Sequence, residues 1–303
     1  MAGEVLVDVE GTRLRLSNLE KVLYPDEGFT KGEVIDYYSR IAPVLLPHLA
    51  DRPVTFRRFP DGVAKAGFFE KNAARNAPDW LRLVTIETPG STTGAESLDF
   101  ALLSDLPSLV WAGNQAGLEL HVPQWTVGPR GARRPPDLLV FDLDPGPPAT
   151  IVECARVAVL LRGLLEADGL TPLAKSSGSK GMQLYAAITT TSRTRPSEYA
   201  KSLAERLAKE NPRLVVSRMA KSLRPHKVFI DWSQNNPQKT TVAPYSLRAR
   251  PRPTVSTPLT WDEVTACEAS ADLSFTSEDV LERVGKHGDL FAPLLVKKRP
   301  RLP

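Results

Sequence analysis

The stretch Leu138-Leu139-Val140-Phe141-Asp142-Leu143-Asp144-Pro145-Gly146 decides how this chain is interpreted, because an apolar run ends in two acids and then stops. The pattern predicts a buried strand. Side chains alternate between the faces of a strand, so Asp142 and Asp144 should share one face, roughly 7 Å apart, while Leu143 faces the core. Pro145-Gly146 should end the strand and leave both carboxylates at its rim. Carboxylate oxygens in that arrangement suit Mg²⁺ or Mn²⁺, although a solvated strand end would show the same short pattern.

The composition is that of a globular protein that can bury a sizeable core. The chain has 303 residues, of which 42% are hydrophobic, which is enough for one elaborate domain or two tightly joined lobes. No apolar stretch is long enough to span a bilayer, and the first residues lack the pattern of a signal peptide, so we expect a cytoplasmic protein. The two cysteines, Cys154 and Cys267, are too few for a zinc site.

The charge is unevenly distributed along the chain. The formal net charge is +4, which by itself does not identify a nucleic-acid partner. Residues 213–252, however, contain a single acid, Asp231, and the following nine basic residues: Arg213, Arg218, Lys221, Arg224, Lys227, Lys239, Arg248, Arg250 and Arg252. A local basic field of this kind attracts phosphates, although any one of these residues could lie on a solvated surface.

Two further segments of the second half place polar groups at the end of a strand. Leu173–Gly181 predicts a strand that runs into a loop of Ser, Gly and Lys, and the alternating residues after it make the element a hairpin. The backbone amides and hydroxyls of that loop, with Lys180, could cradle phosphates, although the P-loop pattern is absent. Lys227–Trp232 predicts a third apolar strand, which carries Asp231 at its end.

The other segments predict a mixture of strands, helices and loops. Strands are expected at residues 12–16, 52–60 and 119–125, and helices at residues 34–42, 106–118, 151–168 and 196–209. Phe68 and Phe69 are expected in a loop, where they could form an exposed stacking platform or place one ring in the core. Residues 129–136 are predicted to be a loop between two lobes, and residues 291–303 a basic, disordered tail.

A two-metal nucleotidyl-transfer site would explain the acids, the hairpin loop and the basic surface together. In such a site two cations bridge the attacking and leaving oxygens of an in-line displacement. The catalytic metal ligands would be Asp142, Asp144 and Asp231. The groups that bind a triphosphate and offset charge on the leaving pyrophosphate would be Ser177, Lys180 and Arg224. A phosphatase or glycosyltransferase could use the first two acids but would leave the third unexplained.

Several blocks of the sequence resemble those of a known protein family. The blocks are Phe141–Pro145, Ser177–Gly181, Val228–Asn235 and Lys239–Arg248, together with Lys21–Pro25, Phe68–Lys71 and His121–Trp125. In order and content they resemble the polymerase domain of bacterial ligase D, which is the primase-polymerase of bacterial non-homologous end joining. That domain is a branch of the archaeo-eukaryotic primase superfamily. The similarity runs from about residue 14 to residue 290.

The resemblance implies an α+β fold of the archaeo-eukaryotic primase type. A mixed N-terminal lobe and an RRM-like catalytic lobe would enclose the active site between them. We expect a single primase-polymerase domain over residues 1–290, with lobes at about 1–130 and 137–290. Because the sequence shows no ligase motif and no nuclease module, we also expect either a stand-alone polymerase or a domain cut out of a longer protein, and the start at Met1 slightly favours the former.

The activity implied by the resemblance is template-directed addition of nucleotides at gaps and broken ends, with ribonucleotides preferred. The cofactors would be two Mn²⁺ or Mg²⁺ ions, with Mn²⁺ preferred. The partners would be NTPs or dNTPs and double-stranded DNA with gaps or 3′ overhangs and a 5′-phosphate, with Ku and a separate DNA ligase as further candidates. No membrane partner is expected, and the cellular location would be the bacterial cytoplasm, at the nucleoid.

The resemblance also implies roles for single residues. The nucleotide would be bound by Ser177, Lys180, Arg224, Arg57, His121, Gln234, Arg248 and Gln183. The 5′-phosphate of the downstream strand would be bound by Asn18, Lys21 and Lys31, and Phe68 and Phe69 would stack on template bases. A doubly charged terminal phosphate attracts two converging ammonium groups more strongly than an internal phosphodiester does.

Two positions depart from the family pattern. Family members usually carry His where this chain has Gln183, and Lys where it has Arg57. A glutamine can donate a hydrogen bond to phosphate, but it cannot be cationic or titrate near neutral pH. A non-catalytic or weakly catalytic module that bridges DNA ends is therefore the alternative hypothesis.

Overall fold

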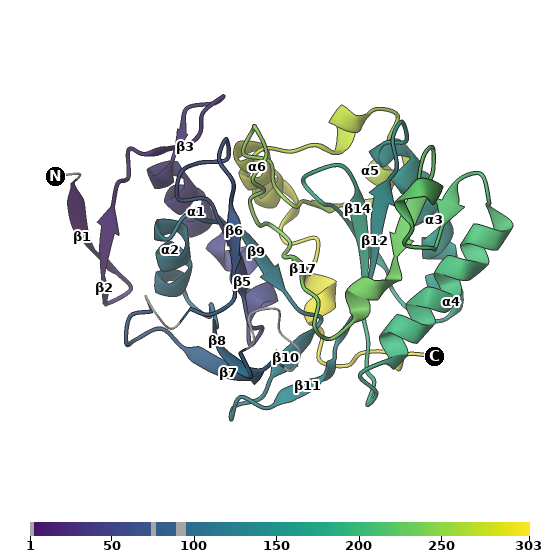
Figure 1. Ribbon diagram of the computed structural model, residues 1–303, viewed down its shortest axis with the longest axis horizontal. Coiled ribbons are helices and arrows are strands. Elements are labelled where there is room, and N and C mark those ends of the chain that lie inside the picture. Colours follow the sequence, from purple (N-terminus) through teal and green to yellow (C-terminus); the bar gives the residue numbers. More distant parts are fainter. Residues whose placement is uncertain (1–2, 74–76, 89–94) are drawn as a thin grey trace.

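The computed structural model describes residues 3–73, 77–88 and 95–303 (Figure 1). Its two larger sheets each carry their own helices and define two lobes that lie side by side. The first lobe holds a four-stranded sheet in the order β17-β9-β5-β6, and the second lobe holds a six-stranded sheet in the order β15-β16-β12-β14-β13-β18. Helices and mostly antiparallel strands are thus combined as the predicted α+β class requires.

The first half of the chain builds most of the first lobe. Its strands are β1 (Glu4–Val9), β2 (Thr12–Ser17), β3 (Val22–Tyr24), β4 (Phe29–Thr30), β5 (Thr55–Arg58), β6 (Phe68–Glu70), β7 (Leu83–Glu87), β8 (Ser97–Ala101), β9 (Gly117–Val122), β10 (Trp125–Val127) and β11 (Arg133–Pro136). Its helices are α1 (Lys31–Leu49) and α2 (Leu106–Asn114). α1 begins at Thr30, whose hydroxyl accepts a hydrogen bond from the amide of Glu33 in a reciprocal capping box.

The second lobe carries the strand that ends in Asp142 and Asp144. Its strands are β12 (Leu138–Pro145), β13 (Leu173–Ser176), β14 (Met182–Ala187), β15 (Val215–Val216), β16 (Val228–Asp231) and β18 (Pro258–Leu259), and its helices are α3 (Ile151–Ala167), α4 (Arg195–Glu210) and α5 (Trp261–Thr265). Numbered 1 to 4 along the chain, β12, β13, β14 and β16 lie in the order 4-1-3-2, with antiparallel neighbours. With α3 and α4 they form the βαββαβ topology of the predicted RRM-like lobe.

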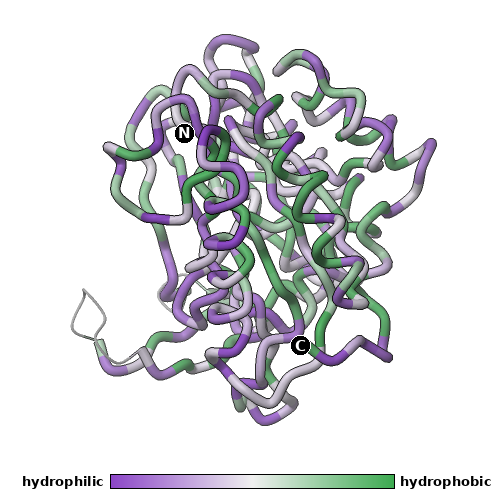
Figure 2. Tube along the Cα trace, turned by 90° about the vertical axis from the view of Figure 1, so that its right-hand side faces the viewer, coloured by the Kyte–Doolittle hydropathy of each residue, from purple (hydrophilic) through white to green (hydrophobic). Residues whose placement is uncertain are grey.

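The helix α3 shows why this lobe folds as the sequence predicts. Thr150 caps its first turn and Glu153 completes the capping box. The apolar positions recur every three or four residues and are buried: Cys154, Val157, Ala158, Leu161 and Leu165. This stripe contributes to a core shared with β12 and β14. Figure 2, viewed from the side of this lobe, shows hydrophobic segments gathered inside it and hydrophilic turns at its periphery.

The two lobes are not contiguous in sequence, which corrects the predicted boundary near residues 130–137. β17 (Thr241–Val242) pairs with β9 and so completes the sheet of the first lobe. α6 (Ser277–His287) contacts α1, and its Val280 belongs to the core of the first lobe. In Figure 1 β17 lies between the two lobes. The chain crosses back because β9 has a free edge that β17 can pair with.

Three local predictions were also wrong in detail. Phe68 and Phe69 lie in β6 instead of a loop, because β6 pairs with β5. Residues 133–136, predicted as part of a connecting loop, form β11 and pair with β10. The helix predicted at residues 106–118 ends at Asn114, since β9 begins at Gly117. The described residues also form the short 3₁₀ helices η2 (Lys221–Leu223), η3 (Trp232–Asn235), η4 (Ser270–Leu273) and η5 (Ala292–Leu295).

The C-terminal segment is ordered against the second lobe, whereas the sequence predicts a disordered tail. Phe291, Leu294 and Leu302 are buried, and the first two pack with Val140 and Tyr185. One of the basic residues that suggested disorder has a partner, since Arg299 forms an ion pair with Asp137 at 3.0 Å. Apolar residues spaced among the charges therefore anchor the segment.

No helix in residues 3–73, 77–88 and 95–303 is long and apolar enough to cross a membrane.

Candidate active site

The structure brings the three predicted metal-binding acids to one edge of the second lobe. β12 and β16 are antiparallel neighbours, and their register places Asp231 directly opposite Asp142. Asp144 follows two residues later on β12, so its side chain shares a face with that of Asp142. Leu143 between them is fully buried, as predicted. The alternation seen in the sequence is therefore the geometry of the site.

Repulsion within this cluster shows in the pKa values. The pKa of Asp142 is raised to about 7, first by burial and then by the charge of Asp144, while a hydrogen bond from Gln183 acts in the opposite direction. Burial and then the charge of Asp231 raise the pKa of Asp144, and Arg224 opposes this. The acids thus repel one another even though Arg224 lies near Asp144 and Lys239 pairs with Asp231 at 3.8 Å, and a divalent cation would relieve this repulsion.

The third acid is held by its own turn. Oδ1 of Asp231 accepts hydrogen bonds from the amide and the hydroxyl of Ser233, and Oδ2 accepts one from Nε2 of Gln234 at 2.9 Å. Within the described part of the chain, no set of three His, Cys, Asp or Glu side chains is arranged to hold a metal ion as it stands. The donor chemistry nevertheless fits a hard cation, because all three groups are carboxylates at one strand edge.

Gln183 lies on β14 directly opposite Asp142. Its Nε2 donates a hydrogen bond of 3.0 Å to Oδ1 of Asp142. The side chain is 4% exposed. In this structure Gln183 therefore contacts a predicted metal ligand, whereas the sequence assigns it to the nucleotide.

The predicted phosphate loop is the turn of the β13–β14 hairpin. The hydroxyl oxygen of Ser177 accepts hydrogen bonds from the amides of Ser179 and Gly181, so it shapes the turn. Lys180 is exposed at the tip. Gly181 allows the turn to lie against β12, because a Cβ there would be 2.1 Å from the carbonyl oxygen of Leu143.

Arg224 is held against the other side of the acids. Its guanidinium stacks on the ring of Phe229 at 3.9 Å and donates a hydrogen bond to the carbonyl of Met219. A Cβ at Gly146 would lie 2.0 Å from the carbonyl oxygen of Arg224, so only glycine permits this close approach. Arg224 thereby stays close enough to lower the pKa of Asp144.

Three of the predicted nucleotide ligands surround a buried acid that the sequence analysis missed. Glu119 on β9 is 1% exposed. It forms ion pairs with Arg57 at 3.2 Å and Arg248 at 3.3 Å, and its Oε2 lies 2.8 Å from Nε2 of His121. Burial alone would raise the pKa of Glu119, but the hydrogen bond with His121 and the charge of Arg248 outweigh it and bring the pKa to about 2. Burial lowers the pKa of His121.

Lys175 is a second buried charge that the sequence analysis did not assign. It lies on β13, is fully buried and donates a hydrogen bond of 2.5 Å to the hydroxyl of Ser256. Burial and then the charge of Arg248 lower its pKa well below the usual value, while Asp142 acts in the opposite direction. The residues of β13 alone give no signal that this lysine is buried.

A pocket of about 330 Å³ lies in front of the acids. Eight of the predicted residues line it: His121, Asp142, Asp144, Ser177, Lys180, Gln183, Gln234 and Arg248. Asp231, Arg224 and Arg57 are not among the residues that line it. The structure thus collects most of the predicted nucleotide site around one opening.

The predicted 5′-phosphate residues gather elsewhere, in the first lobe. The amides of Lys21 and Lys31 bond the carbonyls of Asn18 and Lys21, respectively, which ties the three residues together. Nζ of Lys21 pairs with Asp61 at 2.9 Å, whereas Nζ of Lys31 donates to the carbonyl of Ser17. Burial and then the charge of Lys21 lower the pKa of Lys31 to about 8.

The two predicted stacking residues are exposed and flanked by arginines. Phe68 and Phe69 are 46% and 60% exposed. Arg58 lies over the ring of Phe68 at 5.5 Å and Arg57 over that of Phe69 at 5.7 Å. Phe69 also meets His121 edge to face at 5.6 Å. This aromatic platform therefore connects the first lobe to the wall of the catalytic pocket, and the alternative of a core ring is excluded.

An RRM-like sheet with paired acids on one face of an interior strand, beside a Ser/Gly/Lys hairpin, defines a class of protein, the primase-like nucleotidyltransferases. The chain matches the model of the LigD primase-polymerase domain over residues 30–291. It therefore belongs to the LigD primase-polymerase domain family, a family of DNA-directed nucleotidyltransferases that require a divalent metal.

Curated relatives and a solved structure agree with this assignment. The chain is 45% identical over 283 residues to the multifunctional non-homologous end joining protein LigD of Mycolicibacterium smegmatis, covering 93% of this chain and 36% of the relative. It is 32% identical over 280 residues to the bifunctional LigD of Bacillus subtilis, covering 91% and 43%. This chain thus spans less than half the length of these relatives.

The solved structure is the polymerase domain from Mycobacterium tuberculosis ligase D in complex with DNA. The similarity has a TM-score of 0.87 and 41% sequence identity, and it covers 94% of this chain and 99% of that chain. The predicted archaeo-eukaryotic primase-like fold is therefore confirmed.

Proposed function

We propose that this chain is the polymerase of a bacterial end-joining or gap-repair pathway, adding nucleotides to a 3′ end opposite a template. The observation that carries the proposal is the arrangement around one pocket. Asp142 and Asp144 line it together with Ser177 and Lys180 of the hairpin turn, and Asp231 lies opposite Asp142 on the next strand. Carboxylates for metal and a cradle for phosphates thus face the same space.

The metal ligands would be the three acids. Asp142, Asp144 and Asp231 would hold two divalent ions, Mn²⁺ or Mg²⁺, whose chemistry when bound is to stabilise charge on the attacking and leaving oxygens. Asp231 would exchange at least one of its hydrogen bonds with Ser233 and Gln234 for this role. Arg224, which already lowers the pKa of Asp144, would neutralise charge on the same side.

The triphosphate would lie on the hairpin turn. The hydroxyl oxygen of Ser177 accepts from two amides, which leaves its proton free to donate to a phosphate. Lys180, exposed at the tip, would add a positive charge that offsets the charge developing on pyrophosphate. Arg248 and His121, fixed by Glu119, and Gln234 would form the opposite wall.

The DNA would be held by the first lobe. Lys21 and Lys31, with Asn18, would bind a 5′-phosphate on the downstream strand, and Lys21 would leave its exposed pair with Asp61 to do so. Phe68 and Phe69 would stack on template bases, which an exposed aromatic platform does with little preference for sequence. A gap with a phosphate on its downstream side matches this arrangement.

The wider biology is proposed from the family. Relatives named for non-homologous end joining support broken DNA as the substrate. We propose Ku and a separate DNA ligase as partners and the bacterial nucleoid as the cellular site from the family resemblance alone. Ribonucleotide and Mn²⁺ preference are expected on the same basis.

Primer extension on a short gapped duplex tests the proposal. The assay supplies Mn²⁺ or Mg²⁺ and either rNTPs or dNTPs, and the duplex carries a 5′-phosphate or a 5′-hydroxyl downstream. We expect incorporation that the phosphate stimulates and that is greater with rNTPs and Mn²⁺. The Asp142→Ala variant should bind DNA without incorporation, whereas Asp36→Asn, at an exposed acid of α1, should behave as wild type. Tight binding by the wild type without any incorporation would favour the end-bridging alternative.

A further inference from the structure

A chain of buried hydrogen bonds leads away from the catalytic carboxylate Asp142. Gln183 donates from Nε2 to Asp142, and its Oε1 accepts from the hydroxyl of Tyr185 at 3.3 Å. The hydroxyl of Tyr185 also lies 2.7 Å from Oγ1 of Thr241. Thr241 in turn accepts a hydrogen bond of 2.6 Å from Nε2 of Gln124. Gln183, Tyr185, Thr241 and Gln124 are each at most 5% exposed.

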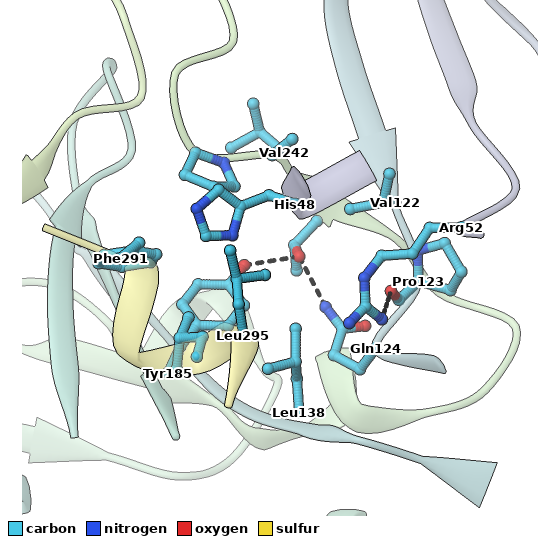
Figure 3. A pocket seen from close by; sticks show the side chains of 14 residues that line it. His48, Arg52, Val122, Pro123, Gln124, Leu138, Tyr185, Val242, Phe291 and Leu295 are labelled. Carbon is cyan, nitrogen blue, oxygen red and sulfur yellow. Dashed lines mark hydrogen bonds between the residues drawn. The ribbon is translucent and has the colours of Figure 1, made fainter. Parts of the chain in front are cut away.

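Figure 3 shows the far end of this chain, with Tyr185 and Gln124 on opposite sides of a cavity and hydrogen bonds running between them. The cavity measures about 30 Å³, which is room for a water molecule. Oε1 of Gln124 is buried and accepts no hydrogen bond from the described residues. The hydrogen-bond chain therefore ends at a small cavity whose lining is mostly apolar, beside Gln124.

The donors and acceptors of the chain fit together in one direction only. An ionised Asp142 can only accept, so Gln183 must present its NH₂ group to it and its oxygen to Tyr185. Tyr185 must then donate to Gln183 and accept from Thr241. Thr241 donates to Tyr185 and accepts from Gln124. In this arrangement every proton of the hydrogen-bond chain points toward Asp142, and reversing the amide of Gln183 would place its oxygen against an oxygen of Asp142.

This chain of hydrogen bonds also crosses from one lobe to the other. Gln183 and Tyr185 lie on β14 of the second lobe, whereas Thr241 lies on β17, which belongs to the sheet of the first lobe. Gln124 lies just after β9 of that sheet. The link between Tyr185 and Thr241 therefore depends on how the lobes are docked.

We propose that Tyr185, Thr241 and Gln124 are positioning residues for Asp142, which fix the amide of Gln183 only when the two lobes are docked. This deepens the proposed function and rests on it, because it takes Asp142 as a metal ligand. A histidine at position 183 would offer a ring to the same neighbours. A glutamine offers an amide with two nearly isosteric orientations. The hydrogen-bond chain selects the one in which the NH₂ group faces Asp142.

The test is the affinity for Mn²⁺ in the absence of DNA and nucleotide, measured by electron paramagnetic resonance of the free ion. Tyr185→Phe removes only the hydroxyl and should weaken Mn²⁺ binding about threefold to tenfold, as expected for one buried hydrogen bond. Thr241→Val breaks the link between the lobes and should weaken binding about twofold, because Tyr185 can still reach Gln183.

Tyr37→Phe is the matched control. The buried hydroxyl of Tyr37 on α1 donates to the carbonyl of Tyr245 at 2.9 Å and has no part in the chain. We expect it to lower the melting temperature about as much as Tyr185→Phe while leaving Mn²⁺ affinity unchanged. Equal loss of Mn²⁺ affinity in both variants would show general destabilisation and overturn the proposal.

A double-mutant cycle isolates the route through Gln183. In a Gln183→Leu background, Tyr185→Phe should cause no further loss of Mn²⁺ affinity. An additive loss would overturn the proposal, as would unchanged affinity in Tyr185→Phe alone. A loss in Tyr185→Phe but not in Thr241→Val would reject the coupling between lobes. Wild-type protein that binds Mn²⁺ but incorporates no nucleotide would reject the proposed function and leave this inference standing.

Discussion

The acid cluster of the second lobe and the basic pair of the first lobe are opposite in charge but alike in construction. In each cluster, like charges lie close together and are partly shielded from water. As a result, the pKa of a residue in each cluster moves toward 7. Asp142 rises to about 7 and Lys31 falls to about 8. Burial is the largest cause in both cases, followed by a neighbouring like charge. Both sites are therefore built to receive a ligand of the opposite charge.

The two clusters differ in how far their charge is already satisfied. Lys21 pairs with Asp61, and Lys31 donates to a main-chain carbonyl. Asp142 accepts a hydrogen bond from Gln183 while facing the charges of two other acids. The unbalanced field is thus stronger at the acids. We expect catalysis to depend more steeply on the acid cluster than DNA binding depends on the basic pair.

The largest expected effect follows from removing one acid. Asp142→Asn should lower nucleotide incorporation by about a thousandfold or more, because metal stabilisation of the transition state is worth several kcal/mol and each 1.36 kcal/mol is tenfold in rate. Binding of a gapped duplex, measured by fluorescence anisotropy, should change little. Equal losses of incorporation and binding would contradict the separation between the two clusters.

Removing the buried lysine should have a smaller effect, confined to the phosphate. Lys31→Met should reduce the preference for a 5′-phosphate over a 5′-hydroxyl about tenfold to a hundredfold, the value of charge-assisted hydrogen bonds. Single-turnover incorporation at saturating DNA should stay close to wild type. Lys201→Met, at an exposed lysine of α4, is the control. If Lys31→Met lost affinity equally for both duplexes, Lys31 would be a general DNA contact.

The aromatic platform lies between the two clusters and should respond differently from both. Phe69→Ala should weaken template binding about fivefold to tenfold, at the lower end of the range for stacking on one base. The loss should be the same with and without the 5′-phosphate, as judged by anisotropy on both duplexes. Leu6→Ala, at an exposed apolar residue of β1, should have no effect. Dependence on the phosphate would place Phe69 in the phosphate site instead.

The smallest effect is a pH dependence of phosphate recognition. The pKa of Lys31 is about 8, below that of an ordinary lysine, so its charge is complete below pH 7 and is lost as the pH rises through 8. The preference for the 5′-phosphate should therefore fall severalfold between about pH 7 and 8.5 in the free protein. Lys31→Arg, which stays charged throughout, should abolish the decline. A flat profile in the wild type would show that Lys31 titrates normally.

Strand periodicity was sufficient for those predictions that depend on residues close together in the sequence. Alternation placed Asp142 and Asp144 on one face, and the apolar run before Asp231 predicted its strand, so the acid edge of the sheet was predictable. The hairpin that carries Lys180 was predictable for the same reason. Each of these predictions needs only the residues of one segment.

What the sequence could not show depends on partners that are distant along the chain. Glu119 and Lys175 look like ordinary charges in strands, and only the fold buries them among Arg248, His121 and Ser256. The interleaving of the lobes through β17 also depends on pairing over more than a hundred residues. Burial of the C-terminal segment likewise needs the surface that receives it.

The close approach of backbone at Gly146 and Gly181 has a consequence for how this site can change during evolution. Neither residue carries a functional group, yet any side chain at either position would collide with a carbonyl oxygen of the site. Selection should therefore purge substitutions there as strongly as at the acids. At these two positions backbone spacing therefore restricts substitution, even though neither residue takes part in the chemistry.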